Sequence, residues 1–221
     1  MTDAAQAIAA NVAGVRARVA DAAQRAGRDP ADITLVAAAK TVPAELLAAV
    51  LAAGVIDLGE NRAQELLTKA PVLASGPVAP RWHFIGTLQR NKVRSLAPWV
   101  ERWHSVDRRE LGETVARHAP GAHVLVEVNL GDEVTKAGCG RDEVAGIVGA
   151  LRDLGLLVDG LMTVPPEDAE PRRWFAMLAE LAAREGLREL SMGMTHDYEV
   201  AVEEGATMVR VGRALFGPRR V

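Results

Sequence analysis

A lysine closes one of the most apolar stretches of the chain. The segment ITLVAAAK runs from Ile33 to Lys40, and its β-branched start favours a strand that is buried on both faces. Lys40 is then either a solvated strand terminus or an amine held in a partly dry pocket. In such a pocket burial lowers the pKa of a lysine, and the neutral amine that results is able to condense with an aldehyde.

Two glycine-containing turns near the end of the chain have the composition of an anion site. SMGMTHD, residues 191–197, precedes the predicted helix DYEVAVEEG, so free backbone N–H groups and the helix dipole would face an anion there. VRVGRALFG places Gly212 directly after a predicted strand, where the backbone of a glycine approaches a phosphate closely. Taken alone, these glycines are equally typical of tight turns.

The elements that must position these residues begin with a helix. Apolar residues recur at three- and four-residue spacing in residues 4–26, namely Ile8, Val12, Val15 and Val19. This spacing predicts an amphipathic helix, which Gly27 and Pro30 end.

After this helix, eight short apolar runs alternate with amphipathic helical patterns. The runs are residues 33–39, 55–59, 82–86, 102–106, 123–129, 157–164, 188–193 and 207–212. Alternation of strands and helices indicates a parallel sheet with crossover helices. We therefore predict an α/β protein with a (β/α)₈ TIM barrel, forming a single domain over residues 1–221, with an extra N-terminal helix in residues 1–28. An open, doubly wound sheet is the alternative, because periodicity does not prove closure.

Barrels of this kind carry their sites at the carboxyl ends of the strands, often with a phosphate bound after strands seven and eight. Closure would place Lys40, at the end of strand one, beside strand eight and its turn. An amine beside a phosphate cradle is the arrangement that holds pyridoxal 5′-phosphate (PLP) as a Schiff base. Arg210, one strand away, would reach the pyridine nitrogen or the phosphate.

Several motifs resemble a known family. They are VAAAKTVP, LGENRAQE, WHFIGTLQRNK, HSVD, GLMTV, LSMGM and MVRVGRALFG, in this order between residues 33 and 217. They are similar to motifs of the YggS/PROSC family of PLP-binding homeostasis proteins, whose members resemble the barrel domain of bacterial alanine racemase. The resemblance implies that Lys40 carries PLP. It also implies a set of residues around the ring and phosphate: Asn61, Ser191, Gly193, Thr195, Arg210, Gly212 and Arg213.

Two positions depart from the family pattern. Thr87 stands where the family usually has a histidine, and Thr195-His196 stand where it usually has a serine and an aspartate. Thr195 keeps a hydroxyl for a phosphate contact. His196 replaces an acid by a base and changes the electrostatics of that turn.

The expected function is that of a PLP carrier or regulator without strong catalysis of its own. A racemase needs acid-base groups on both faces of the cofactor, and Lys40 serves one face. We expect no second domain after Val221 to supply the other, and Tyr198, the one tyrosine, is more typical of a packing residue. A PLP-dependent racemase and a Schiff-base aldolase remain alternatives.

A metal-dependent barrel hydrolase is a further alternative. Its ligands would come from four residues on or near strands, Glu60, His83, His104 and Asp107. Both histidines precede their strand ends, and neither belongs to a His-x-His pair. We therefore expect them to be packed or hydrogen-bonded strand residues.

Composition sets the remaining expectations. The 221 residues are 49% hydrophobic with a formal net charge of −3, which argues against nucleic acid as the main partner. Cys139 is the one cysteine, so no intrachain disulfide forms. Neither a secretory signal nor an apolar run of membrane-spanning length is found. We expect a cytoplasmic monomer whose partners are PLP and the PLP-dependent apoenzymes that would receive it.

Overall fold

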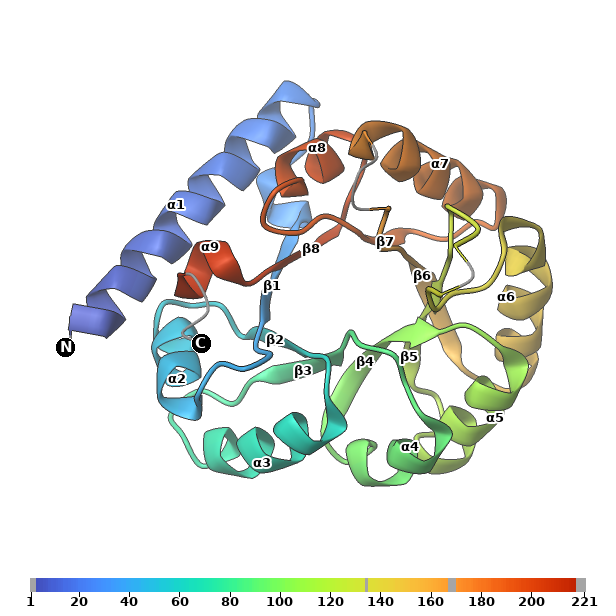
Figure 1. Ribbon diagram of the computed structural model, residues 1–221, viewed down its shortest axis with the longest axis horizontal. Helices are drawn as coiled ribbons and strands as arrows, with labels where there is room; N and C mark the ends of the chain where they lie inside the picture. The colour runs from blue at the N-terminus through green and yellow to red at the C-terminus, as the bar shows by residue number, and fades with distance from the viewer. Residues whose placement is uncertain (1–2, 134, 167–169, 218–221) are drawn as a thin grey trace.

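The computed structural model describes residues 3–133, 135–166 and 170–217. Within these ranges eight parallel strands close into a barrel in chain order, with β8 paired to β1 (Figure 1). The strands are β1 Thr34–Ala38, β2 Asp57–Glu60, β3 Arg81–Phe84, β4 Val100–Val106, β5 His123–Glu127, β6 Leu157–Met162, β7 Glu189–Ser191 and β8 Met208–Val211. The predicted (β/α)₈ barrel is confirmed, and the open-sheet alternative is wrong.

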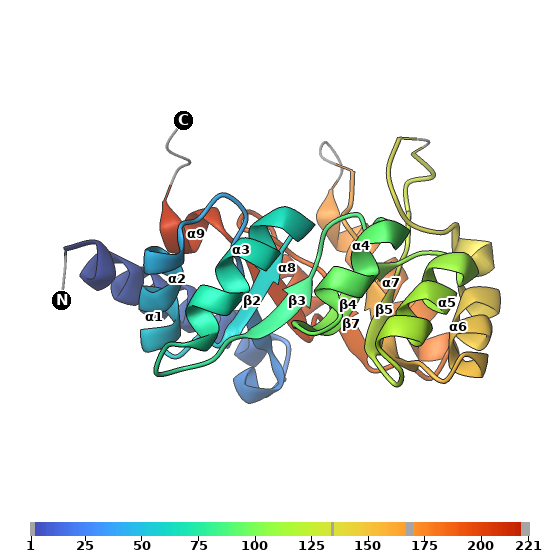
Figure 2. The same cartoon turned by 90° about the horizontal axis from the view of Figure 1, so that it is seen from below.

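A helix follows each strand, and these helices form a ring around the barrel (Figures 1 and 2). They are α2 Ala44–Ala52, α3 Ala63–Ala74, α4 Arg90–Leu96, α5 Arg109–His118, α6 Val144–Asp153, α7 Pro171–Arg184, α8 Tyr198–Glu203 and α9 Arg213–Phe216, with short 3₁₀ turns at Pro30–Asp32 and Arg141–Glu143. Left-handed glycines follow several of them, such as Gly54 and Gly155 with φ of 83° and 75°. Glycine ends helices in this way because it lacks a Cβ.

The N-terminal helix α1 spans Asp3–Arg25, beginning and ending one residue earlier than predicted. It packs against α2, α8 and α9 (Figure 1). Its predicted apolar face is buried, and Arg18 and Arg25 on its other face pair with Glu199 and Glu203 of α8. Although α1 has 23 residues, neither it nor any other helix in the described ranges is apolar enough to cross a membrane.

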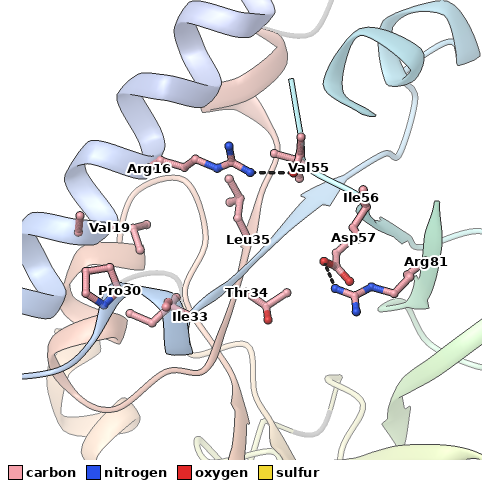
Figure 3. Close-up of a pocket in the computed structure, with 13 residues that line it drawn as sticks. Arg16, Val19, Pro30, Ile33, Thr34, Leu35, Val55, Ile56, Asp57 and Arg81 are labelled. Atoms are coloured by element: carbon pink, nitrogen blue, oxygen red, sulfur yellow. Dashed lines mark hydrogen bonds and ion pairs between the residues drawn. The ribbon is translucent and has the colours of Figure 1, made fainter. Parts of the chain in front are cut away.

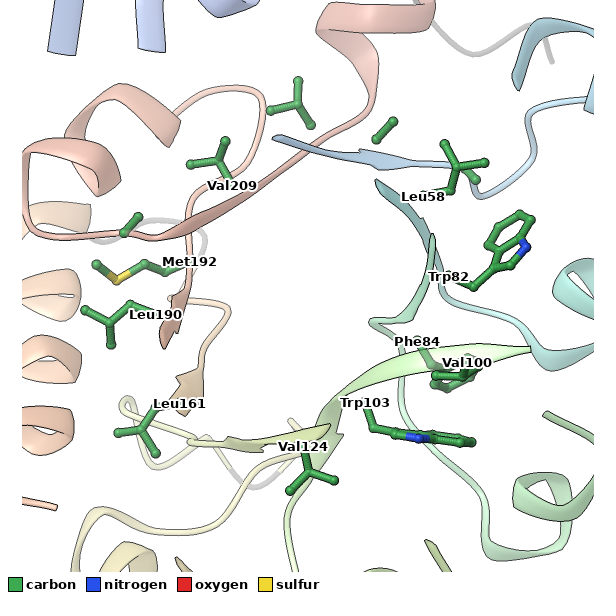
Figure 4. Packing of buried hydrophobic residues seen from close by; sticks show 14 of the residues in the cluster. Leu58, Trp82, Phe84, Val100, Trp103, Val124, Leu161, Leu190, Met192 and Val209 are labelled. Carbon is green, nitrogen blue, oxygen red and sulfur yellow. The ribbon is translucent and has the colours of Figure 1, made fainter. Parts of the chain in front are cut away.

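The main hydrophobic core lies between the strands and the surrounding helices. Outward-pointing side chains such as Trp82, Trp103 and Leu190 leave the strands toward this ring (Figure 4). Alternation along each strand sends the next residue inward. The sheet therefore has an apolar outer face, which fixes the register of each strand.

The interior of the barrel is unusually polar. A small apolar cluster contains Val36, Leu125, Met162 and Met208. Beside it lie four buried polar residues that come from four different strands: His83, His104, Ser191 and Arg210. Most barrels of this type fill the interior with branched aliphatic side chains. Buried polar groups need hydrogen-bond partners, so this interior must be organised by specific hydrogen bonds.

Candidate cofactor site

Lys40 lies two residues beyond the end of β1, at the carboxyl edge of the barrel. The neighbouring strand is β8, with Val36 opposite Arg210, so closure brings the two candidate residues to adjacent strands as predicted. Of the two interpretations of Lys40, a solvated strand terminus and an amine in a partly dry pocket, the exposure of the residue agrees with the first. The buried run ends at Ala39, and Lys40 lies in the turn above the sheet.

The turn that carries Lys40 is fixed on both sides. Lys69 Nζ of α3 donates to the carbonyl of Ala39 at 2.8 Å, and Glu65 Oε2 accepts from the backbone N–H of Thr41 at 2.7 Å. Thr41 has a φ of 63°, a left-handed conformation that a β-branched residue adopts at a cost. The flanking hydrogen bonds therefore stabilise the backbone around Lys40 in a conformation that would be unfavourable without them.

These two anchors belong to one buried ion cluster. Lys69 Nζ lies 2.5 Å from Glu60 Oε1 and 2.9 Å from Glu65 Oε2. Burial raises the pKa of Glu60 above its ordinary value, although Lys69 lowers it. Burial also acts to raise the pKa of Glu65, but hydrogen bonds from Lys69 and Thr41 outweigh it and leave that pKa lowered. The sequence analysis missed this cluster as a support for Lys40.

Asn61 follows β2 directly, and Glu60 Oε2 accepts from its backbone N–H at 2.9 Å. The side-chain oxygen of Asn61 is buried without a hydrogen-bond partner among the described residues. Gly86 packs so closely that a Cβ there would lie 2.3 Å from the carbonyl oxygen of Asn61. Asn61 is thus held tightly through its backbone, while its side chain keeps an unused acceptor.

Arg210 is held from inside the barrel. Its Nη1 donates to Ser191 Oγ at 2.6 Å, and its Nη2 donates to the carbonyl of Thr163 at 2.8 Å. Burial lowers the pKa of Arg210 to about 10, and the charge of Glu127 opposes this effect. Arg210 therefore remains a cation at neutral pH in a buried position.

Ser191 and Arg210 are brought together as predicted. The hydroxyl of Ser191 is hydrogen-bonded to two side chains inside the barrel, those of Arg210 and His104. Ser191 is fully buried, and its Oγ also lies 2.8 Å from Nδ1 of His104. Its contacts are those of a residue that orients Arg210.

The two predicted glycine turns touch each other. The N–H of Arg210 donates to the carbonyl of Gly193 at 2.9 Å, and Arg213 Nη2 lies 2.6 Å from His196 Nε2. Gly193 has a φ of 88°, and a Cβ there would lie 2.5 Å from that of Ala201, so this turn requires glycine. The turns after β7 and β8 thus form one surface.

Gly212 connects this surface to the strand of Lys40. A Cβ at Gly212 would lie 3.5 Å from Ala38 in β1. Thr195 is half-buried. The structure therefore gathers the predicted residues of β1, β7 and β8 at one edge.

Some backbone N–H groups of the predicted anion site are used within the turn itself. The N–H groups of Asp197 and Tyr198 at the start of α8 both donate to the carbonyl of Met194, and Met194 N donates back to Asp197 Oδ1. These N–H groups are therefore used within the turn. The acidic Asp197 at this position also disfavours a second anion.

Glu127, at the end of β5, is a residue that sequence analysis missed. Its Oε2 is buried without a hydrogen-bond partner in the described part of the chain. Burial raises the pKa of Glu127 to about 7, the charge of Asp107 raises it further, and Arg210 opposes both. A carboxyl group that titrates near neutral pH is typical of functional sites.

Two further positions singled out in the sequence are Thr87 and Tyr198. Thr87 is exposed. Tyr198 is 1% exposed, and the guanidinium of Arg18 lies 5.5 Å from its ring centroid, so it packs toward α1. The interpretation of Tyr198 as a packing residue is confirmed.

A pocket of about 540 Å³ lies at the opposite end of the barrel (Figure 3). It is lined by the starts of β1, β2 and β3 and by α1, with the Asp57–Arg81 ion pair at one side. Because sites of barrel enzymes form at the carboxyl ends, this pocket is separate from the candidate site.

Similarity to known proteins shows the family to which the chain belongs. Residues 5–220 match the family model described as alanine racemase, N-terminal domain. The chain is 43% identical over 222 residues to a pyridoxal phosphate homeostasis protein of Pseudomonas aeruginosa, with 96% of both chains covered. It is 38% identical to the protein of the same name from Escherichia coli strain K12, covering 96% of this chain and 97% of that one. The chain belongs to the pyridoxal phosphate homeostasis protein family.

Solved structures agree with this placement. PipY of Synechococcus elongatus, solved with PLP bound, is 33% identical and superposes with a TM-score of 0.81 over 95% of this chain and all of PipY. A Paramecium bursaria Chlorella virus arginine decarboxylase, at 14% identity and a TM-score of 0.68, shares the fold alone.

In this pyridoxal phosphate homeostasis family member, the residues considered for a metal site are engaged with one another or with cations. Glu60 pairs with Lys69, and His83 and His104 are bonded to each other at 2.8 Å. In the described ranges, no three acidic, histidine or cysteine side chains gather as metal ligands would. The interpretation of both histidines as hydrogen-bonded strand residues is confirmed.

Proposed function

We propose that this protein binds PLP, holds it as a Schiff base on Lys40 and takes part in PLP homeostasis. The observation that carries the proposal is the convergence of Lys40, Arg210 and the two glycine turns at the carboxyl edge of β1, β7 and β8. PipY, a relative with the same fold, has been solved with PLP bound, which supports the choice of cofactor.

The residues present fit this cofactor. Asn61 offers a buried, unused acceptor, and the half-buried Thr195 offers a hydroxyl. Arg210 and Arg213 supply positive charge, and Gly193 and Gly212 allow close approach of a ligand to the backbone. When bound, PLP supplies an aldehyde that reacts reversibly with amines.

Each residue of the chain then has a distinct task. Lys40 provides the attaching amine on a turn whose backbone is held by Lys69 and Glu65. Arg210, oriented by Ser191, would offer its remaining N–H groups to the ring or phosphate. Gly212 and Arg213 would hold the phosphate from the turn after β8.

Borohydride reduction followed by peptide mass spectrometry tests the attachment. We expect the pyridoxyl mass on Lys40 and its loss in a Lys40→Ala variant. The exposed Lys92→Ala variant is the matched control and should keep the label. A pyridoxyl mass on Lys69, Lys92 or Lys136 would contradict the proposed site.

A second measurement tests the phosphate contacts. PLP should bind far better than pyridoxal, because charge-assisted hydrogen bonds to phosphate are the stronger kind. Equal affinities would show that the glycine turns after β7 and β8 do not hold the phosphate.

We propose a carrier rather than a racemase. Racemisation needs a proton donor or acceptor on the face opposite Lys40, and each positioned group contributes about 10²–10⁴-fold. Tyr198, the residue considered for this role, is buried toward α1. We therefore expect negligible racemisation of alanine or serine by the holoprotein in a chiral assay. Turnover of about 1–10³ per second would overturn the carrier role and point to Glu127 as the second group.

We further propose that the protein is a cytoplasmic monomer that passes PLP to apoenzymes. The accessible position of Lys40 supports exchange with amines from solution. Light scattering measures the oligomeric state. Reactivation of a PLP-dependent apoenzyme by the holoprotein, faster than by an equal amount of the Lys40→Ala variant mixed with PLP, measures the transfer.

A further inference from the structure

A chain of hydrogen bonds crosses the interior of the barrel and ends at Arg210. Asp57 Oδ1 lies 3.0 Å from Nε2 of His83, and Nδ1 of His83 lies 2.8 Å from Nε2 of His104. Nδ1 of His104 lies 2.8 Å from Ser191 Oγ, which accepts from Arg210 Nη1 at 2.6 Å. Residues of five strands thus join the amino end of the barrel, where Asp57 lines the pocket of Figure 3, to the candidate site.

Each link of this chain needs one hydrogen, and the carboxylate at its end decides where every hydrogen lies. An ionised carboxylate only accepts, so His83 donates to Asp57 from Nε2. A neutral imidazole carries one N–H, so Nδ1 of His83 accepts the Nε2–H of His104. Nδ1 of His104 is then an acceptor as well, and it takes the hydroxyl hydrogen of Ser191.

The assignment requires Asp57 to be ionised and His104 to be neutral. Burial acts to raise the pKa of Asp57, but hydrogen bonds from His83 and Arg81 outweigh it and leave that pKa lowered. Burial lowers the pKa of His104 well below its ordinary value, and positive charge on His83, where it is protonated, and on Arg210 lowers it further. Asp57 is therefore ionised, and its charge is already paired with Arg81 at 2.7 Å.

We propose that Asp57 is a positioning residue for the cofactor site. Through His83 and His104 it directs the hydroxyl hydrogen of Ser191 away from the site, so that this hydrogen does not point at the guanidinium that donates to the same oxygen. The guanidinium of Arg210 is thereby held in one orientation by a group at the opposite end of the barrel.

Replacing Asp57 by asparagine should reverse the chain without changing its shape. Arg81 donates to Oδ2 of Asp57. In the variant, the side-chain oxygen of the asparagine must therefore face Arg81, and the NH₂ group of the asparagine must face His83. His83 Nε2 then has to accept, and both imidazoles carry their hydrogens on Nδ1. The hydroxyl of Ser191 accepts from His104 and no longer donates to it.

Asp159→Asn is the matched control. Asp159 likewise lies near the amino end of its strand and accepts from a histidine, with His123 Nδ1 2.9 Å from its Oδ2. His123 takes no part in the hydrogen-bond chain from Asp57 to Arg210. The control should leave His83 and His104 unchanged.

The measurement is ¹⁵N NMR of the imidazole nitrogens in protein without PLP, at about pH 8, above the ordinary histidine pKa of about 6.5. The chain has five histidines, and single His→Gln variants assign their signals. We expect Nε2–H on both His83 and His104 in the natural sequence and Nδ1–H on both in Asp57→Asn. Nδ1–H on His104 in the natural sequence, or an imidazolium at His83, would overturn the proposal, and this holds even if Asp57→Asn fails to fold.

A second arm links the chain to the cofactor and rests on the proposed function. The reversal frees the hydroxyl hydrogen of Ser191 to turn toward the guanidinium of Arg210, which should weaken PLP binding by Asp57→Asn about five- to tenfold, with no such loss in Asp159→Asn. Reversed imidazoles with unchanged PLP affinity would overturn the positioning role. If the natural sequence itself fails to bind PLP, the proposed function fails, while the NMR result still decides the direction of the chain.

Discussion

Lys40 and Arg210 lie on adjacent strands, yet the structure supports them by opposite means. The turn of Lys40 is bonded to charged side chains outside the barrel, in the cluster of Glu60, Glu65 and Lys69. Arg210 is bonded inside the barrel to a serine hydroxyl and a backbone carbonyl. One support consists of ion pairs within α3 and between α3 and the sheet, and the other consists of directional hydrogen bonds from a buried cation to neutral acceptors.

This difference predicts different weaknesses. Removing one member of a buried ion cluster leaves an unpaired charge, which costs stability whatever the geometry of the rest. Changing one member of a chain of hydrogen bonds through imidazoles and a hydroxyl can leave the number of bonds intact and alter only their direction. Substitutions in the cluster that supports Lys40 should therefore mainly lower folding stability. Substitutions in the hydrogen-bond chain that supports Arg210 should mainly change the direction of its hydrogen bonds.

The largest effect is expected for Lys69→Met. Glu60 is fully buried and would lose its only cation within the cluster, at a cost of about 3–5 kcal/mol in the free energy of unfolding. Urea unfolding followed by tryptophan fluorescence measures this loss. The exposed Lys92→Met variant is the control and should change stability by less than about 0.5 kcal/mol.

The double variant Glu60→Gln with Lys69→Met tests the cause. If an unpaired charge is responsible, removing that charge should recover most of the stability lost in Lys69→Met. No recovery would mean that the loss comes from packing of the lysine stem, and the contrast between the two supports would not hold.

A somewhat smaller effect is expected for Glu127→Gln, and it depends on pH. The pKa of Glu127 is about 7 in the folded protein against 4.5 for the free residue. The folded state therefore binds this proton more tightly, and the resulting stability is present below about pH 4.5 and is lost as the pH rises through 7. At most about 3 kcal/mol is involved.

Unfolding at pH values on either side of 7 tests this prediction. Glu127→Gln should show a flatter stability profile than the natural sequence and be the more stable of the two at alkaline pH. The exposed Glu110→Gln variant should keep the natural profile. Equal slopes in all three proteins would show that Glu127 is not held in a protonated state.

The sequence allowed the barrel to be predicted because each strand is an apolar run and each helix has its own periodicity. The short helix α9 carries no such periodic signal, having four residues, and was not predicted. Lys40, Arg210 and the glycine turns were placed correctly because strand ends meet at one edge of a barrel. The sequence left the burial of Lys40 open, since an apolar run does not show how far its last residue rises above the sheet.

The partners of these residues could not be predicted in the same way. His104 and Ser191 are 87 residues apart in the chain and meet only because the barrel closes with a particular register. Once closure is assumed, the alternation of side chains along a strand does place Asp57 and His83 on the inner face of the barrel. This alternation is the one signal that the sequence offers for the hydrogen bonds between Asp57 and Arg210. Lys69 lies on a helix, and its pairing with Glu60 depends on how α3 packs on β2.

The smallest effect is expected for Arg81→Gln, and it separates the charge of Asp57 from its hydrogen-bonding direction. Arg81 has a side chain that is 47% exposed, so loss of its ion pair with Asp57 should cost less than about 1 kcal/mol. That pairing lowers the pKa of Asp57, so the cost should be present above the ordinary pKa of an aspartate, about 3.9, and vanish at lower pH. Since Asp57 remains a carboxylate, it still accepts from His83, and the imidazole ¹⁵N signals should keep their Nε2–H pattern. A small loss of stability with unchanged tautomers would establish that the carboxylate alone directs the interior chain, whereas reversed tautomers in Arg81→Gln would assign that control to Arg81.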